Sequence, residues 1–219
     1  MAPGDRARVP PRAIPHGWLS YTKVTVIVTF MRTTLEAIAD LADAHAGYFT
    51  TGEAAAAGVS RRALSHHAST GTLDRVEYGI YRLRRYPAQR FEDMVVVTLW
   101  AGPDSAISHE SALVVHDLGD AMPAVTHVTV PRPFRGHRPG VLVHLETLDP
   151  DERVVIDAVP VTSVERTLLD VAGSADPGIV RAAAREALDR GLTTRRRLER
   201  IVGNGDDPAR RVLLGTLRR

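Results

Sequence analysis

Several residue types are scarce or missing from this chain of 219 residues, and each scarcity excludes a class of protein. There is no cysteine, which excludes disulfides, thiol catalysis and thiolate metal sites and fits a cytoplasmic protein. Residues 24–30 are apolar but far too short to span a bilayer, and no signal-peptide pattern is evident. We therefore expect no membrane partner.

The chain also lacks a large excess of positive or negative charge. The formal net charge is only +2, so any affinity for nucleic acid has to come from locally clustered arginine. Lys23 is the only lysine among 28 basic residues, and arginine is the better reader of phosphate and guanine, although compositional drift explains the same bias. With 44% hydrophobic residues, the chain can bury a core of one or two domains.

Catalytic patterns are likewise missing. The sequence contains no glycine-rich phosphate loop, no nucleophile motif and no metal-ligand cluster. His109 and His116 share a helical face, but their spacing of seven differs from the three or four that a metal pair prefers, so we interpret them as core or surface histidines. We predict no catalytic residue, no metal site, no cofactor and no enzymatic activity.

Composition divides the chain into three parts. Residues 1–30 open with a stretch rich in Pro, Gly and Arg, and we interpret them as a disordered or mis-annotated N-terminal extension. Met31 precedes the first convincing helix pattern, so we hypothesise that it is the physiological start; an intact mass beginning at Met1 would refute this. Residues 31–86 are predicted to form a DNA-binding domain, and residues 88–219 a second domain.

Residues 50–83 have the pattern of two helices followed by a ribbon. Thr50 and Glu53 have the spacing of a capping box, so they open a short helix that Gly58 ends. Ser60 is a good N-cap for a second helix. Two strand-like segments around a Glu-Tyr-Gly turn then resemble a β-hairpin. This order predicts a winged helix-turn-helix, whose second helix enters the DNA major groove.

The second helix of this motif is polar on its outward face. Leu64 and Ala68 lie four residues apart and are expected to face the core, so the polar side chains of the N-terminal half point outward. The ribbon adds further arginines. We predict DNA contacts from eight residues: Ser60, Arg61, Arg62, Ser65, His66, Arg75, Arg82 and Arg84. A solvated polar face in a domain that binds something else is the simpler alternative.

The second domain mixes strand and helix patterns. Residues 125–130 and 141–145 have strand composition, and residues 153–156 and 159–161 complete about four strands. Helix starts follow at four capping positions: Thr162, Asp176, Thr193 or Thr194, and Asp207. The predicted fold class is α+β, with an N-terminal winged helix-turn-helix followed by a mixed α/β C-terminal domain that has a small sheet and terminal helices.

Three charged features have more than one interpretation. The basic, proline-rich loop at residues 131–140 either touches nucleic acid or an acidic partner, or is simply solvated. Residues 195–219 contain eight arginines and three acidic residues, which suit a solvated face, phosphate contacts or docking to an acidic groove. Arg166 and Asp170 lie one helical turn apart, and an ion pair is a simpler account of them than catalysis.

An ordered set of short motifs, from residue 33 to the C-terminus, resembles the AbiEi-type antitoxins of type IV toxin–antitoxin systems. The motifs are Gly47-Tyr48-Phe49-Thr50, Gly58-Val59-Ser60, Leu64, Gly71-Thr72-Leu73, Gly79-Ile80-Tyr81-Arg82-Leu83, Ile107-Ser108-His109-Glu110-Ser111-Ala112, His127-Val128-Thr129-Val130-Pro131 and Val161-Thr162-Ser163-Val164-Glu165-Arg166-Thr167-Leu168-Leu169-Asp170. The resemblance also favours a helix over a strand at residues 89–100.

The resemblance implies a function that composition and spacing do not. It implies a transcriptional autorepressor whose N-terminal domain binds double-stranded DNA at inverted repeats in its own promoter. It also implies that the C-terminal domain neutralises a cognate nucleotidyltransferase toxin. Two alternatives remain: a protein-interaction module without a DNA site, and a degenerate relative of a nuclease.

Overall fold

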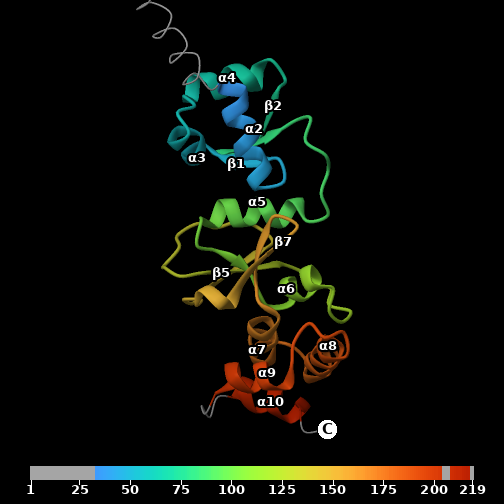
Figure 1. Cartoon of the computed structure of the whole chain (residues 1–219). Coiled ribbons are helices and arrows are strands. Elements are labelled where there is room, and N and C mark those ends of the chain that lie inside the picture. Colours follow the sequence, from blue (N-terminus) through green and yellow to red (C-terminus); the bar gives the residue numbers. More distant parts are fainter. Residues whose placement is uncertain (1–32, 204–207, 218–219) are drawn as a thin grey trace, which may run out of the picture.

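The computed structural model describes residues 33–203 and 208–217. The predictions for residues 1–30, for a start at Met31 and for an N-cap at Asp207 lie outside these ranges. The described chain forms three units stacked along one long axis, with the N-terminal unit at one end and the last helices at the other (Figure 1). None of the helices described in these ranges is long and apolar enough to cross a membrane.

The N-terminal unit is a winged helix-turn-helix, as predicted. Its elements are α2 (Thr34–Ala44), β1 (Tyr48–Thr50), α3 (Thr51–Ala56), α4 (Arg61–Ser69), β2 (Leu73–Glu77) and β3 (Ile80–Leu83). Strand β3 lies between β1 and β2 and pairs antiparallel with both. Phe49, Leu64 and Leu73 are fully buried and join the helices to this small sheet.

Local capping rules account for the helix starts in this unit. Thr33 and Glu36 form a reciprocal capping box, and so do Thr50 and Glu53, where Thr50 N donates to the Glu53 carboxylate at 2.7 Å. The His45 imidazole lies 3.0 Å from the same carboxylate, and their hydrogen bond lowers the pKa of Glu53 to about 2. The start of the short helix α3 is therefore stabilised by Thr50, Glu53 and His45, all of which belong to the N-terminal unit.

The middle unit is built around a mixed five-stranded sheet. Its elements are α5 (Glu92–Ala101), β4 (Ala106–Ile107), α6 (His109–His116), β5 (Thr126–Val130), β6 (Val141–Leu145), a 3-10 turn η1 (Pro150–Glu152), β7 (Arg153–Ile156) and β8 (Val159–Thr162). The strand order is β6-β5-β4-β8-β7, with parallel pairing of β5 with β6 and of β4 with β8. Helix α5 confirms the helix predicted at residues 89–100, whereas the two-residue strand β4 was not predicted.

Helix α5 belongs to the packing of both units. Tyr48 and Ile80 of the winged helix share one buried cluster with Val95 of α5 and with Val128 and Val161 of the central sheet. In Figure 1, α5 lies between the N-terminal unit and that sheet. The boundary predicted near residue 87 therefore falls in a connection between two units whose packed side chains are continuous.

The last unit consists of four helices: α7 (Val164–Ser174), α8 (Pro177–Asp189), α9 (Arg195–Val202) and α10 (Pro208–Leu217). Asp176 caps α8 by accepting from Gly178 N at 2.6 Å, and Thr194 caps α9 by accepting from Arg197 N. The cap of α7 differs from the prediction: Ser163 Oγ accepts from Arg166 N, because Thr162 is buried in β8. The fold class is the predicted α+β.

A buried arginine joins the sheet to the first of these helices. The predicted pair of Arg166 with Asp170 is present at 2.7 Å, and the same guanidinium also contacts Glu152 at 3.4 Å and Glu146. The Arg166 side chain is only 9% exposed, and its charge is balanced by the buried Asp170, the largely buried Glu152 and the half-exposed Glu146. This arrangement explains Arg166 without a catalytic role.

Candidate nucleic-acid interface

Helix α4 is held in place from its buried side. Gly58, with φ of +81°, lets the chain turn sharply between α3 and α4. Val59 N donates to Ala54 O at 2.8 Å, and Ser60 Oγ caps α4 by accepting from Ala63 N at 3.1 Å. Leu64 is 1% exposed and anchors the helix to the core. The outward face of α4 is therefore set by backbone geometry and packing.

The polar side chains at the start of α4 face solvent. The exposed predicted residues on this face are Ser60, Arg61, Arg62, Ser65 and His66. Among the described residues, the guanidinium groups of Arg61 and Arg62 make no ion pair or hydrogen bond, so no other described residue neutralises either charge. A helix end with unpaired arginines suits hydrogen bonding to phosphates and base edges.

The hairpin beside α4 ends in an aromatic tip. Tyr78 is 94% exposed, and the Arg75 guanidinium lies 5.6 Å from the centre of its ring. Gly79, with φ of +79°, completes the turn between β2 and β3. Arg75, one of the predicted DNA contacts, is exposed. Tyr78 is not among the predicted contacts, because only its place at the end of the hairpin distinguishes it from a core tyrosine.

Two predicted arginines of the hairpin are engaged within the chain. Arg82 is 17% exposed, contacts Glu92 of α5 at 2.9 Å and lies over the Tyr48 ring, so it belongs to the junction between units. Arg84 is 55% exposed, but both carboxylate oxygens of Asp74 accept from its guanidinium. We therefore remove Arg82 from the predicted contact surface and regard Arg84 as partly neutralised.

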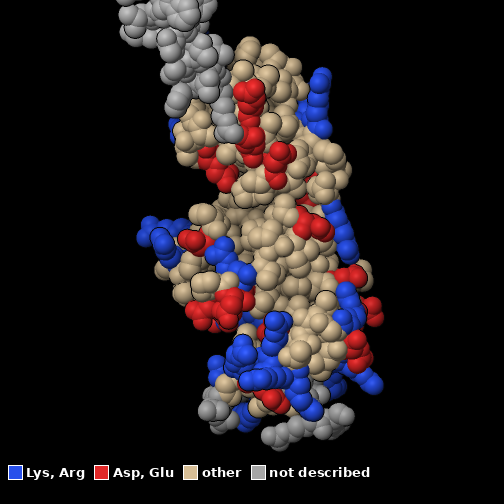
Figure 2. All heavy atoms as spheres, in the orientation of Figure 1, with Lys and Arg blue, Asp and Glu red and all other residues tan. Residues whose placement is uncertain are grey.

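Charges of opposite sign occupy different sides of the N-terminal unit. Helix α2 exposes Glu36, Asp40 and Asp43, and Figure 2 shows acidic side chains along the face at which α2 lies. Basic side chains project from the same unit on the side of β2 (Figure 2). A polyanion is therefore repelled from α2 and attracted to the side of the hairpin.

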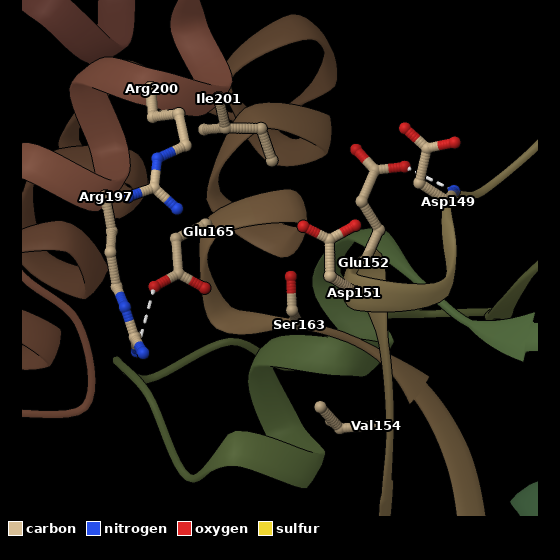
Figure 3. Close-up of a pocket in the computed structure, with 9 residues that line it drawn as sticks. All are labelled: Asp149, Asp151, Glu152, Val154, Ser163, Glu165, Arg197, Arg200 and Ile201. Atoms are coloured by element: carbon tan, nitrogen blue, oxygen red, sulfur yellow. Dashed lines mark hydrogen bonds and ion pairs between the residues drawn. The ribbon is translucent and has the colours of Figure 1, made fainter.

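A second charged site lies between the central sheet and α9. It is a cavity of about 600 Å³ lined by Asp149, Asp151, Glu152, Val154, Ser163, Glu165, Arg197, Arg200 and Ile201. Arg197 and Arg200 form one wall and Asp149, Asp151 and Glu152 the other (Figure 3). Arg197 lies 3.8 Å from Glu165, so this basic wall is partly balanced from inside. Arg195 and Arg196 of the same helix are exposed.

His109 and His116, which share a helical face in the sequence, have different surroundings in the structure. His116 is buried, and its Nε2 lies 2.7 Å from Thr162 O, as expected for a core histidine. His109 instead lies beside His127 and His144. Burial, together with these two neighbouring imidazoles, lowers the pKa of His109 to about 3. Three imidazole rings are thus grouped at the start of α6.

The fold and the exposed basic helix define a protein of the winged helix-turn-helix class. Comparison with known proteins adds a family: residues 36–84 match the family model described as "Transcriptional regulator, AbiEi antitoxin". This segment is thus of the AbiEi antitoxin type, which confirms the resemblance over the N-terminal unit.

The chain was also compared with curated proteins and with solved structures. None of the curated proteins matches this chain. Among solved structures, the RV2827C protein from Mycobacterium tuberculosis matches at 17% sequence identity with a TM-score of 0.49, over 82% of this chain and 75% of that one.

Proposed function

We propose that this protein is a transcriptional autorepressor and antitoxin, which binds inverted repeats in its own promoter and neutralises a nucleotidyltransferase toxin. The observation that supports the first role is the exposed N-terminal half of α4, where Arg61 and Arg62 have no partner among the described residues. The matched model describes regulators and antitoxins, which supports both roles. Such a regulator would act in the cytoplasm.

The proposed DNA surface consists of α4 and the tip of the hairpin. Arg61, Arg62, Ser65 and His66 read the major groove, and Ser60 presents its hydroxyl at the helix start. Arg75 and Tyr78 contact the backbone beside that groove, with Arg84 contributing in part. The sheet β1-β3-β2 and the α5 junction hold both parts of the surface in one orientation.

The test is binding of the full chain to its own promoter fragment across a range of salt concentrations. Replacing Arg61 and Arg62 together by Ala is expected to weaken specific binding by about 1–3 kcal/mol for each arginine that holds a guanine. Where the contact is to phosphate instead, the salt slope is expected to fall by about one per arginine.

A matched control removes two positive charges elsewhere. Arg181 and Arg185 are both exposed on α8, and replacing them by Ala changes the net charge equally. This control is expected to bind like the unchanged protein. If the Arg61/Arg62 variant binds as well as the control, α4 is not the reading helix, and an interaction module without a DNA site becomes the better explanation.

We assign the antitoxin role to the C-terminal domain predicted at residues 88–219, which comprises the middle and last units. Helix α9 exposes Arg195, Arg196 and Arg200 at the end of the molecule opposite to α4 (Figure 1), which suits docking to an acidic groove of a partner. A toxin held there leaves the winged helix accessible to DNA.

Co-expression tests this role. The adjacent reading frame is expressed alone and with this protein, and growth is expected to fail alone and to recover with it. Replacing Arg195, Arg196 and Arg200 by Glu is expected to abolish recovery while promoter binding persists. Recovery with the substituted protein would exclude α9 as the docking surface. Magnesium-dependent DNA cleavage by the pure protein would favour the nuclease alternative.

A further inference from the structure

Three histidines from three separate elements meet on one face of the central sheet. His109 is the first residue of α6, His127 lies in β5 and His144 in β6. Each offers one ring nitrogen such that the three atoms lie within 4.8 Å of one another. The set is partly buried, so it lies in the fold but is accessible to small ions.

The sheet register places two of these side chains on the same face. His127 pairs with Leu142 and His144 with Thr129 in the parallel ladder of β5 with β6, so the two histidines are diagonal neighbours. His127 Nδ1 and His144 Nε2 lie 3.0 Å apart. Two nitrogens that each bind a tetrahedral Zn²⁺ at 2.0–2.1 Å lie about 3.3 Å apart, so these atoms need little displacement to share an ion.

The third histidine is held by a strained backbone. His109 has φ of +52°, a strained conformation for residues other than glycine that occurs preferentially at functional sites. Ser108 Oγ lies 3.1 Å from Nδ1 of His109, which leaves Nε2 as the ligand atom. The rings of His109 and His144 stack with centres 3.7 Å apart, so metal binding requires a rotation of one of these rings.

The carboxylate of Glu110 lies next to His127, on the side away from His144. Glu110 Oε2 lies 3.5 Å from Nε2 of His127, the nitrogen opposite to the one that faces His144. This oxygen is buried and has no hydrogen-bond partner among the described residues. Such a group lowers the stability of the fold, so its presence calls for an explanation such as a bound ion. Carboxylates commonly accept from the second ring nitrogen of a metal-bound histidine and so fix its orientation.

We propose that His109, His127 and His144 bind one divalent transition-metal ion of the Zn²⁺ type, with Glu110 orienting His127. Three imidazole ligands suit Zn²⁺ and leave a fourth position for water or for a group of a partner. The ion would tie the start of α6 to β5 and β6. This inference does not depend on DNA binding or on toxin neutralisation.

The full chain, stripped with EDTA and transferred to chelator-free buffer, is titrated with Zn²⁺ in a calorimeter and with Co²⁺ in an absorption spectrometer. We expect one ion per chain, a visible Co²⁺ band of tetrahedral type, and a higher Tm with Zn²⁺. Replacing His144 by Gln is expected to abolish the band. Glu110→Gln keeps the shape of the side chain and is expected to weaken binding about 10–100-fold.

His137, exposed in the loop at residues 131–140, supplies the matched control, since His137→Gln removes one histidine outside the cluster. It is expected to bind Zn²⁺ like the unchanged protein. The proposal is overturned if the unchanged chain binds no ion, or if His144→Gln and Glu110→Gln, each shown to be folded by circular dichroism, bind as it does. Equal losses in the His137 variant would also overturn it, because they would indicate non-specific surface binding.

Discussion

The buried arginine of α7 allows a stability prediction with a defined magnitude. We consider Arg166→Met, which replaces a guanidinium by an apolar side chain of similar reach. In the structure this guanidinium is the cation shared by Glu146, Glu152 and Asp170. Its removal leaves three carboxylates close together, and the Asp170 side chain is 4% exposed.

The expected loss follows from the burial of Asp170. Removing one member of a buried ion pair costs about 3–5 kcal/mol, because the remaining charge loses its compensation without regaining water. Asp170 Oδ2 already lacks a hydrogen-bond partner among the described residues, so Asp170 has no alternative donor nearby. Burial raises the pKa of Asp170, so without Arg166 this group takes up a proton readily and the loss becomes smaller at acidic pH.

Urea denaturation of the two proteins at neutral pH measures the difference. The matched control is Arg185→Met on α8, whose side chain is 86% exposed and lies 4.0 Å from Asp189. An exposed pair of this kind contributes less than about 0.5 kcal/mol. A loss of stability in Arg166→Met no larger than that in Arg185→Met would refute the reasoning, because the buried network would then contribute no more than a surface pair.

Three further predictions concern other parts of the chain. Thr50→Ala removes the cap of α3 and is expected to cost about 1 kcal/mol in urea denaturation; unchanged stability would show that the capping box is dispensable. Without metal, the free energy of unfolding should fall as pH drops from 6.5 toward 3, because His109 stays neutral when folded but binds a proton when unfolded; a flat profile in EDTA would contradict this. Arg82→Ala should lower stability and leave the salt slope of promoter binding unchanged, since Arg82 is paired with Glu92; a slope reduced by about one would restore Arg82 to the DNA surface.

Features set by neighbouring residues were predictable from the sequence. The capping boxes at Thr33 and Thr50 and the Asp-Pro start of α8 depend on side chains within three positions, and all three are present. The two-residue strand β4 was missed because its pairing comes entirely from β5 and β8, which lie far away in the chain. The spacing to Glu165 predicts Thr162 as the cap of α7, because spacing alone does not reveal that Thr162 ends a buried strand.

In the candidate site, too, local properties were predictable from the sequence and contacts between distant residues were not. Exposure of Arg61 and Arg62 followed from the position of Leu64 on a short helix, which is a local property. The pairing of Arg82 with Glu92 was not evident, because the two residues belong to different units and meet only when α5 docks. The histidine cluster was missed for the same reason: parallel pairing of β5 with β6 brings together side chains 17 residues apart.

The shared position of α5 has a consequence for how the two ends of the molecule move. The Glu92 carboxylate accepts from Arg82 and from the hydroxyl of Tyr48, and the apolar residues around it are continuous from the hairpin to the central sheet. The winged helix therefore cannot swivel freely on a linker. If the proposed roles hold, a partner docked on α9 would keep a nearly constant distance from DNA bound at α4, and its size would limit how closely a second copy could bind on the same duplex.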